Sequence, residues 1–580
     1  MNIYKKLQED IFTAAADITQ KNTKIKEMPI LLESSKDLSS YDIATNAAMI
    51  IAKATGKNAI ELANLLKDKL SNISYIANIK VAAPGFINFT IKDYKWQNYL
   101  ETVLNGNYKQ QYSNIGNNER VNIEYVSANP TGPLHIGHAR GAVYGDVLSK
   151  LLEKVGYQVT REYYVNDAGL QIDDLARSAY LRYKQAITSQ TIDIPKGLYP
   201  GEYLVPIGKK LAKKYNKTLL TLSEKEYITI IRNFTVEEML KLIKKDLTLI
   251  DVKHDIFFSE KNLHDTGNIK KIIDNLIKKN LVYNGKLTKP KGQNTSNWES
   301  RNQLLFKSSL YNDDQDRPLQ KEDGQWTYFA SDIAYADDKI KRGFKNIILV
   351  LGADHIGYVK RIQAIIQALG EKEKIKLTIK ICQIVNFLKN GAAIKMSKRS
   401  GSFTTVKDVY EAVGKDVVRF LMLTRKNDVI LDFDLIKLKE QSKENPVFYV
   451  QYAYVRAGSI IRNAKCNANT AYEIFNSKKV KFNLLSTIEE LNLMKNLAMW
   501  PKTVESSVKY FEPHRIAFYL QNLAARFHSL WNFKKSNIDY KFIVPQNDEL
   551  TAARIALAAA VREILSEGFK IIGITCTEVM

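Results

Sequence analysis

Apolar residues along this chain change repeatedly from strand-like to helix-like spacing, and one stretch shows the change most clearly. Val121 to Val126 is rich in β-branched and aromatic residues, which predicts a strand. Apolar positions then recur at helical spacing from Val143 to Val155 and stop at Gly156, and Val159 to Val165 predicts a second strand. A strand, a loop, a helix and a strand in this order indicate a parallel pair joined by a crossover helix.

The same order of elements returns in the second half of the chain. Asn346 is followed by a continuous apolar run to Leu351, which ends in Gly-Ala-Asp-His, and Tyr358 to Leu369 follows with helical spacing. Ile379 to Phe387 predicts a further strand. Two such halves predict an α/β fold with a doubly wound, Rossmann-like parallel sheet, which binds ligands at the carboxyl ends of its strands.

The stretch between the two halves, about residues 188 to 302, has a looser pattern. It holds helical segments at Thr235 to Leu249 and Asn268 to Lys279, and we expect it to be an insertion into the sheet domain. Before it, Asn166 and Asp167 follow a predicted strand. These two residues suit the ligand crevice and a simple turn equally well.

Two further domains flank the sheet domain, which we place at residues 113–443. Residues 1–112 predict an N-terminal α+β module, because two strand-like runs within Ile79 to Ile91 follow helical segments. Its predicted helices run through Ile18, from Asp42 to Thr55 and from Ala59 to Leu70. Residues 444–580 predict an all-α C-terminal domain.

Aromatic and arginine residues interleave along the predicted helices of the last domain. They are Tyr449, Tyr452, Tyr454, Arg456, Phe527 and Trp531. Core packing explains most aromatic residues of this kind, whereas stacking on unpaired RNA bases uses the same residue types. Both roles stay open at each position.

Composition and charge add a nucleic acid to the possible partners. The 580 residues are too many for one core, so several domains are expected. Lys and Arg number 85 against 62 Asp and Glu, which gives 85 − 62 = +23 and a pI near 9.4. This charge fits a polyanionic partner, and a genome bias toward Lys, Ile, Asn and Tyr explains it about as well.

The spacing of the cysteines and the absence of a long apolar run argue against a zinc-knuckle, disulfide-rich or membrane protein. Cys382, Cys466 and Cys576 lie far apart and form no C-x-x-C pair, which argues against a zinc knuckle and a disulfide scaffold. No apolar run of about eighteen residues occurs, and the first residues carry charges where a signal peptide has an apolar core. We therefore expect a soluble, cytoplasmic protein without zinc and without a membrane partner.

The loop between the first strand and the first helix of the sheet domain holds the strongest candidate chemistry. His135 and His138 flank Ile136 and Gly137 where the loop becomes helix. A helix start offers unpaired N–H groups and the positive end of the helix dipole, which suit phosphate, and Gly137 leaves room for its approach. A capped helix with surface histidines is the alternative.

Two motifs resemble the signatures of a known enzyme family. Ala128 to Gly141 reads ANPTGPLHIGHARG and is similar to the HIGH signature of class I aminoacyl-tRNA synthetases, in the form found in arginyl-tRNA synthetases. Ile394 to Gly401 reads IKMSKRSG, within a basic loop at about 389–403, and resembles the KMSKS signature with Arg399 inserted before Ser400. The resemblance extends over nearly the whole chain.

The resemblance implies activation of arginine by ATP and transfer of the arginyl group to the terminal ribose of tRNA(Arg). It assigns the phosphates to His135 and His138, and the departing pyrophosphate to Lys395 and Lys398. The residues implied to bind ATP are Pro133, His135, Gly137, His138, Gly352, Asp354, His355, Lys395, Met396, Ser397 and Lys398. Mg²⁺ would accompany ATP, and no protein-held metal is expected.

The resemblance also implies a pocket for arginine and two tRNA-contacting domains. A guanidinium is planar and always charged, so its pocket needs a carboxylate. By resemblance, Asp332 and Tyr328 bind the guanidinium, and Asn129 and Glu124 bind the backbone end of arginine. A helix N-cap is the alternative role of Asp332. The N-terminal module would contact the outer corner of tRNA, the C-terminal domain its anticodon, and the enzyme would be a monomer.

Two other functions stay open. The HIGH and KMSK signatures do not name the amino acid, so a class I synthetase for another amino acid is the first alternative. The absence of paired cysteines and of a large editing insertion weakens several such assignments. The second alternative is a tRNA-binding relative without catalysis, against which the intact signature lysines argue.

Overall fold

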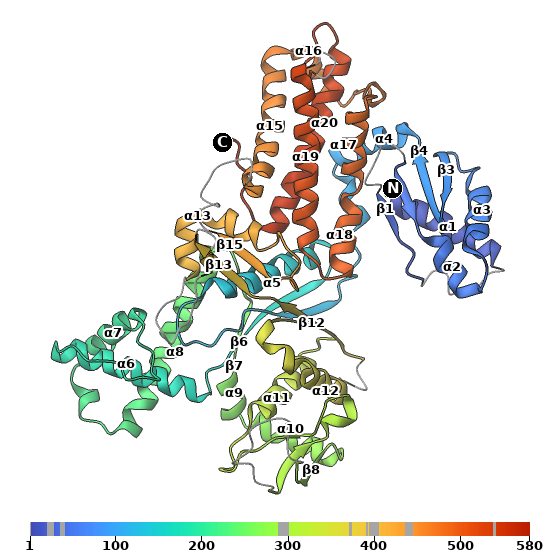
Figure 1. Ribbon diagram of the computed structural model, residues 1–580. Coiled ribbons are helices and arrows are strands. Elements are labelled where there is room, and N and C mark those ends of the chain that lie inside the picture. Colours follow the sequence, from blue (N-terminus) through green and yellow to red (C-terminus); the bar gives the residue numbers. More distant parts are fainter. Residues whose placement is uncertain are drawn as a thin grey trace. The chain divides into compact units, whose positions relative to one another are not determined.

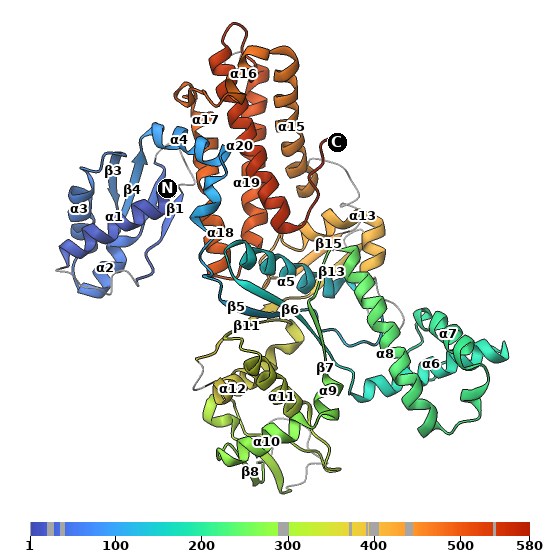
Figure 2. The same cartoon turned by 180° about the vertical axis from the view of Figure 1, so that it is seen from behind.

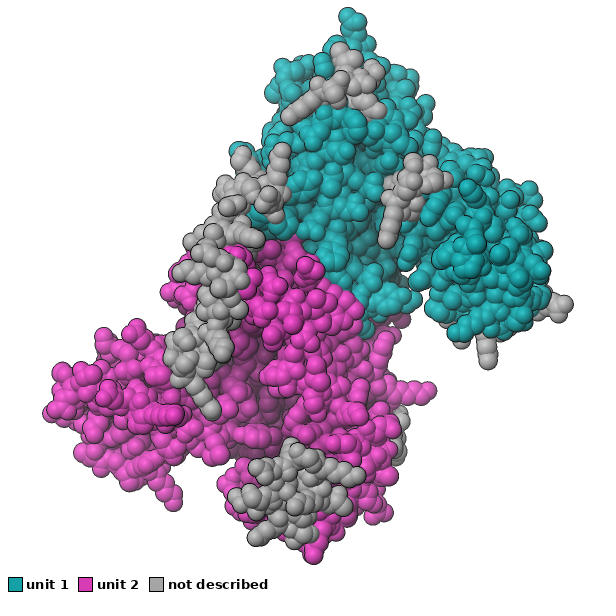
Figure 3. Space-filling view, viewed as in Figure 1, with its two compact units in different colours: residues 1–115, 442–580 teal, residues 116–441 magenta. Residues whose placement is uncertain are grey.

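The computed structural model describes residues 2–19, 28–34, 41–287, 301–370, 374–389, 392–393, 405–434, 445–536 and 541–579. The chain forms two compact units, coloured separately in Figure 3. The sheet unit comprises residues 116–441, and the helical unit comprises residues 1–115 together with 442–580. Each unit contains buried apolar clusters of its own.

A five-stranded parallel sheet organises the sheet unit. Its order is β12-β11-β5-β6-β7, and every neighbouring pair is parallel. The strands are β5 (Arg120–Glu124), β6 (Gln158–Val165), β7 (Ile256–Ser259), β11 (Asn346–Gly352) and β12 (Lys376–Cys382). This topology confirms the predicted α/β, doubly wound fold. Since the chain order reverses between β5 and β11, their carboxyl ends mark the crevice where such sheets bind ligands.

Helices carry the connections of this sheet, and the predicted crossover helix is α5 (Ile136–Lys154). It lies along the sheet in Figures 1 and 2, and its apolar residues Val143, Val147 and Leu151 are fully buried. The other helices of the unit are α6 (Leu170–Thr188), α7 (Val205–Tyr215), α8 (Glu224–Leu249), α9 (Glu260–Asp265), α10 (Asn268–Lys278), α11 (Tyr328–Lys341), α12 (Val359–Gly370) and α13 (Val406–Leu421). Short 3-10 helices include η3 (Glu202–Leu204), η4 (Thr218–Leu220), η5 (Ser308–Tyr311) and η6 (Ala353–Tyr358).

Two small three-stranded sheets accompany the large one. The first has the antiparallel order β10-β9-β8, and the second has the order β14-β13-β15. Their strands are β8 (Val282–Gly285), β9 (Gln303–Phe306), β10 (Arg317–Pro318), β13 (Val385–Lys389), β14 (Ala392–Ala393) and β15 (Leu431–Asp434). The single strand predicted from Ile379 to Phe387 is therefore wrong, because its residues belong to two sheets. Directly after β12, the N–H of Gln383 donates to the carbonyl of Asn427 at 2.8 Å, and the chain leaves the five-stranded sheet at this point.

The expected insertion at about residues 188 to 302 also needs a correction. It is interrupted by β7, whose four residues pair with β6 at the edge of the large sheet. A strand of this length is too short to show a periodic pattern. The helix predicted from Thr235 starts earlier, at Glu224, where Ser223 and Glu226 form a capping box.

The helical unit joins the N-terminal module to the C-terminal helices. The module has a four-stranded antiparallel sheet of order β1-β2-β4-β3. Its elements are α1 (Ile3–Ile18), β1 (Leu32–Ser34), β2 (Ile43–Thr45), α2 (Ala47–Thr55), α3 (Ala59–Leu70), β3 (Ile76–Ala82), β4 (Phe86–Ile91), α4 (Asp93–Leu104) and η2 (Asn107–Gln111). The helix predicted from Asp42 is wrong at its start. Asp42 binds the backbone of β4, since its carboxylate accepts from the N–H of Ile91 at 2.7 Å, and β2 follows it.

The described residues of the C-terminal part of the helical unit form helices joined by turns, without a strand. It contains α15 (Pro446–Asn467), α16 (Asn469–Asn476), η8 (Phe482–Leu484), α17 (Ile488–Ala498), α18 (Trp500–Lys509), α19 (His514–Ser536) and α20 (Asp548–Ile572). The N-terminal module binds these helices directly: Lys495 pairs with Asp42 at 2.7 Å, and Tyr108 donates to Glu563 at 2.9 Å. The limits of separate first and last domains, at 112 and 444, stay predictions.

His254 makes the stability of the sheet unit sensitive to acid. Its ring lies 4.2 Å from the ring of Tyr125 and 5.5 Å from those of Tyr163 and Phe257, and burial lowers the pKa of His254 to about 4. The unfolded chain therefore binds this proton more readily, and stability is lost as pH falls from about 6.5 toward 4. We expect the histidine to cost about 2 kcal/mol of unfolding free energy between pH 7 and pH 5. Urea titrations at both pH values, with His254→Gln beside the exposed His355→Gln, measure this difference; an unchanged pH dependence in His254→Gln contradicts it.

Candidate active site

The turn between β5 and α5 is held by hydrogen bonds from two other helices. The N–H of Leu134 donates to Asp246 of α8 at 2.9 Å, and its carbonyl accepts from the N–H of Val406 of α13 at 2.8 Å. His135 also forms an isolated antiparallel bridge with Thr405. The fold therefore fixes this turn before any ligand binds.

His135 and His138 lie together at the start of α5. His135 is the N-cap residue, and its N–H donates to Nδ1 of His138 at 3.2 Å within a capping box. The two rings stack with their centroids 3.7 Å apart. Because Nδ1 of His138 accepts a hydrogen bond, the neutral ring carries its proton on Nε2, which is then a donor. The histidines cap the helix, as the alternative interpretation predicted, and they also line a pocket.

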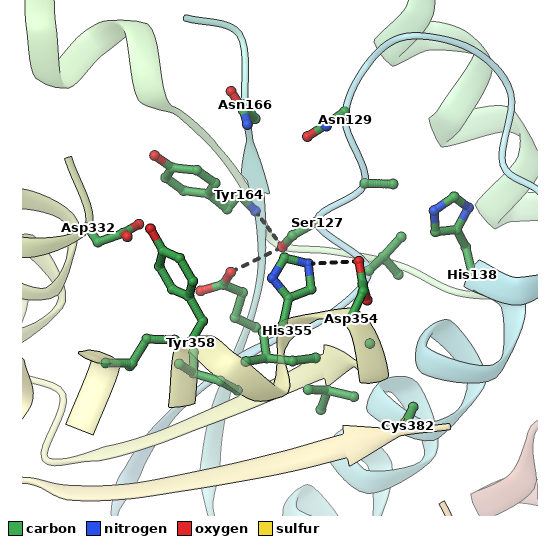
Figure 4. Close-up of a pocket in the computed structure, with 18 of the residues that line it drawn as sticks. Ser127, Asn129, His138, Tyr164, Asn166, Asp332, Asp354, His355, Tyr358 and Cys382 are labelled. Atoms are coloured by element: carbon green, nitrogen blue, oxygen red, sulfur yellow. Dashed lines mark hydrogen bonds and ion pairs between the residues drawn. The ribbon is translucent and has the colours of Figure 1, made fainter. Parts of the chain in front are cut away.

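A pocket of about 1000 Å³ opens where β5 and β11 end. The predicted site residues that line it are Glu124, Asn129, His135, Gly137, His138, Tyr328, Asp332, Gly352, Asp354 and His355. Figure 4 shows Asp332 and His138 on opposite sides of this pocket. Pro133 is buried and is not part of the lining. The predicted residues Lys395, Met396, Ser397 and Lys398 lie outside the described residues.

Asp332 lies on α11 one turn after Tyr328, and it faces other carboxylates. It is not the helix N-cap, because Thr327 caps α11 with its own side chain. Burial, followed by the charges of Glu260 and Glu124, raises the pKa of Asp332 to about 8. Burial and the neighbouring carboxylates both disfavour a negative charge on Asp332. A cation bound beside it would favour the ionised form.

Glu260 belongs to this carboxylate cluster, although the sequence pattern did not single it out. It is only 2% exposed, at the start of α9, and it lines the pocket. Its Oε2 makes no hydrogen bond within the described structure, and its Oε1 lies 3.8 Å from His264. A buried carboxylate oxygen without a donor is costly and marks a place for a ligand. Its position directly after β7, at the end of a parallel strand, could have identified it if that strand had been recognised.

Glu124 and Asn129 have different neighbours. Glu124 pairs with the buried Lys339 at 2.6 Å and accepts from Ser127 at 3.2 Å, and its charge reaches Asp332. Asn129 donates to Gln171 of α6 at 2.9 Å. The structure thus brings Glu124 to the carboxylate cluster, whereas Asn129 lies at another part of the lining. Gln171 is a second lining residue that the sequence pattern did not reveal.

The end of β11 forms the other predicted part of the ATP site. Asp354 and His355 lie on η6, and Nε2 of His355 lies 3.5 Å from a carboxylate oxygen of Asp354. Figure 4 shows the two side chains facing each other, and both are exposed. A Cβ at Gly352 would lie 2.5 Å from the Asp354 carboxylate, so a larger residue there would displace this exposed side chain. This arrangement leaves polar groups open toward the pocket.

Asn166 and Asp167, which the sequence left open between a ligand-binding role and a turn, have different roles in the structure. Asn166 lines the pocket. Asp167 instead holds the start of α9, because its carboxylate accepts from the hydroxyl of Ser259 at 2.6 Å and from the N–H of Lys261 at 2.8 Å. The turn therefore contributes one residue to the site and one to the fold.

Three protein-family models match successive segments of the chain. Residues 5–91 match the arginyl tRNA synthetase N terminal domain, residues 100–443 the catalytic domain of class I (R) tRNA synthetases, and residues 450–580 the DALR anticodon binding domain. The arginine–tRNA ligase of Orientia tsutsugamushi (strain Ikeda) is 64% identical over 590 residues, which cover 100% of both chains. The chain belongs to the arginyl-tRNA synthetase family. The predicted resemblance is confirmed.

Other members of the arginyl-tRNA synthetase family agree. The arginine–tRNA ligase of Rickettsia prowazekii is 54% identical over 574 residues, with 99% of each chain covered. The solved arginyl-tRNA synthetase of Thermus thermophilus has the same fold, with a TM-score of 0.73 over 100% of both chains at 18% identity. Over the described ranges, no helix has the length and apolar character needed to cross a membrane. No group of His, Cys, Asp and Glu among those residues is arranged to hold a metal ion.

Proposed function

We propose that this chain joins arginine to tRNA(Arg). Arginine attacks the α-phosphate of ATP to give arginyl-adenylate and pyrophosphate, and the arginyl group then passes to the terminal ribose of tRNA with release of AMP. One observation carries the proposal: a single pocket has a phosphate-suited helix start on one side and a cluster of acidic side chains, Asp332, Glu260 and Glu124, on the other. These two halves suit a polyphosphate and a guanidinium.

The nucleotide would be bound by the predicted residues of the turn and of β11. Its phosphates would lie at the start of α5, where the N–H groups of the first helical turn and Nε2 of His138 are donors. Asp354 and His355 would bind the ribose and adenine, with Gly352 leaving them room. ATP enters as its Mg²⁺ complex, which shares the neutralisation of the leaving pyrophosphate. Catalysis is then positioning and electrostatic stabilisation, without a covalent enzyme intermediate.

Arginine would be selected by the carboxylate cluster. Asp332 and Tyr328 would bind the guanidinium, with Glu260 and Glu124 adding negative charge around it. Asn129 would bind the backbone end of the amino acid. Lysine offers fewer donors than arginine and would leave buried carboxylate oxygens unpaired, so it should be rejected by up to roughly 10⁴-fold.

The C-terminal helices offer a stacking surface for tRNA. Arg456 lies 4.2 Å from the ring of Tyr452 and 4.7 Å from that of Trp531, and Tyr452 is 41% exposed. Such a stack suits an unpaired anticodon base. Tyr454 and Phe527 are buried, which favours core packing for these two residues. We place the N-terminal module at 1–112, the catalytic domain at 113–443 and the anticodon-binding domain at 444–580 of a cytoplasmic monomer.

An aminoacylation assay with a panel of amino acids tests the function. Purified protein, tRNA(Arg) and MgATP should give charged tRNA and AMP with arginine and with no other amino acid. Charging with a different amino acid would establish the first alternative, another class I specificity. Tight tRNA binding without any charging would establish the second, a binding protein without catalysis.

The signature lysines separate catalysis from tRNA binding. We expect Lys398→Ala to slow adenylate formation by about 10²-fold, since one donor to the departing pyrophosphate is lost while Lys395 remains. Pyrophosphate exchange with tRNA present measures this rate, and filter binding should show tRNA affinity changed by less than about two-fold. Lys407→Ala, at a surface lysine paired with Glu411, is the matched control. A collapse of tRNA affinity in Lys398→Ala would assign this lysine to tRNA instead.

A further inference from the structure

Arg140 is a buried cation that links the helix start at the pocket to the neighbouring part of the pocket wall, at residues 383–386. It follows His138 by two residues on α5 and is 1% exposed. Its Nη1 donates to the carbonyl of Gln383 at 3.0 Å, and its Nη2 donates to the carbonyl of Lys426 at 2.8 Å. One side chain thus joins α5 to two distant parts of the chain.

The two carbonyls belong to connections that are themselves joined. Gln383 connects β12 to β13, and Lys426 lies between α13 and β15. Asn427 holds both connections together, because its carbonyl accepts from the N–H of Gln383 at 2.8 Å and its side chain donates to Ile381 at 2.7 Å. Residues 383–386 line the pocket. Arg140 therefore holds a segment, residues 383–386, that lines the pocket, although Arg140 itself does not line it.

Burying the Arg140 guanidinium costs more free energy than a purely structural role would require. Within the described structure Arg140 has no carboxylate at ion-pair distance, and its buried Nε makes no hydrogen bond. Burial lowers the pKa of its guanidinium. An apolar side chain of similar volume would fill this space at lower cost. Unlike an apolar side chain, the planar guanidinium donates two hydrogen bonds at once, and these tie α5 to two separate connections.

We propose that Arg140 is a positioning residue that fixes the separation between the phosphate-binding start of α5 and the wall at residues 383–386. It does not line the pocket, so it acts on ATP through these two elements. Arg140 thereby keeps the nucleotide half of the pocket at a constant width. In the part of the chain that the structure describes, it has no hydrogen bond to α9 or α11, which carry Glu260 and Asp332. This proposal rests on the proposed function, since it assigns the nucleotide half of that same pocket.

Arg419 provides a matched control. It is 0% exposed, pairs with Asp146 of α5, and donates to the carbonyls of Ile250 at 2.7 Å and Asp251 at 3.1 Å. None of these three partners lines the pocket. Arg419 is therefore an equally buried arginine bound to the same helix, and its ion-pair partner and these two carbonyls lie outside the pocket lining.

The test compares Arg140→Lys, Arg140→Met and Arg419→Lys in the full chain. Calorimetry gives the Kd of MgATP and of arginine, aminoacylation gives both KM values, and thermal melting reports the fold. We expect Arg140→Lys to raise the Kd and KM for ATP about 10-fold and those for arginine by less than about two-fold, because a shorter side chain with one prong lets the wall shift. Arg140→Met should do the same more strongly, and Arg419→Lys should lower only the melting temperature.

Three results would overturn the proposal. Equal losses for ATP and arginine, the same ATP defect in Arg419→Lys, or an Arg140→Lys variant too unstable to purify would show that Arg140 serves the fold alone. Failure of the proposed function is separate: a wild-type chain that binds ATP but does not charge tRNA would refute the function, while the Kd for ATP in the Arg140 variants would still decide the role of Arg140.

Discussion

Replacing Asp332 with Asn should remove arginine recognition without weakening the fold. In the proposed function this carboxylate pairs with the always charged guanidinium of arginine, and loss of such a partner would cost about 4 kcal/mol, or on the order of 10³-fold in kcat/KM for arginine. The pKa of Asp332 near 8 means that burial and the neighbouring carboxylates make its charge unfavourable at this position. Since this pKa lies above the value of an unfolded aspartate, the carboxylate destabilises the fold increasingly as pH rises from about 4 to 8. The neutral amide of the Asp332→Asn variant avoids that cost.

Arginine binding should also release a proton from the wild-type site. At pH 7 a carboxyl with a pKa of about 8 is mostly protonated, and in the proposed function the guanidinium would bind its ionised form. The affinity for arginine should therefore rise with pH between about 6 and 8, approaching ten-fold per pH unit. Calorimetry in buffers of different ionisation enthalpy measures the released proton. Asp332→Asn should show neither the release nor the pH dependence.

Asp337 offers the control on the same helix. It pairs with Lys341, whose side chain is 70% exposed, and a surface pair of this kind contributes little to stability. Asp337→Asn should leave arginine kinetics and melting temperature near those of the wild type. If Asp332→Asn charged tRNA normally, or if it melted well below Asp337→Asn, the carboxylate would be part of the fold and another group would hold the guanidinium.

The parts of the site that were predictable from sequence are those built by local spacing. His135 and His138 stand at the N-cap and third position of one helix, so their contact follows from the helix itself. Tyr328 and Asp332 are one helical turn apart for the same reason. The strands β5, β6 and β11 were predictable because each is long or continuous enough to show its pattern.

The parts that were not predictable depend on pairing between distant segments. Glu260 reaches the pocket only because β7, four residues long, pairs with β6. Gln171 becomes a lining residue through its contact with Asn129, and the break between β12 and β13 is made by Asn427. No periodic pattern within one segment contains these contacts, since they appear only when the sheet has formed.

His138 allows the two interpretations of the helix start to be separated. In a capping box the third helical residue accepts from the N–H of the N-cap, and Glu and Gln fill this position as well as any residue. His138→Glu and His138→Gln should therefore preserve the cap and keep the melting temperature near that of the wild type. His138→Ala should lose the cap and about 1 kcal/mol of stability with it.

Catalysis should respond quite differently to these three variants. A glutamate carboxylate at the start of α5 would repel the phosphates of ATP, so His138→Glu should lower kcat/KM for ATP on the order of 10³-fold despite its intact fold. Gln keeps an N–H donor beside the accepting oxygen, and His138→Gln should stay within about 10-fold of the wild type. His138→Ala should lie between them, because it removes the donor without adding a charge. Steady-state aminoacylation at varied ATP, beside thermal melting, gives both quantities. If His138→Glu were as active as His138→Gln, the histidine would be a helix cap only, and the phosphates of ATP would have to bind elsewhere in the pocket.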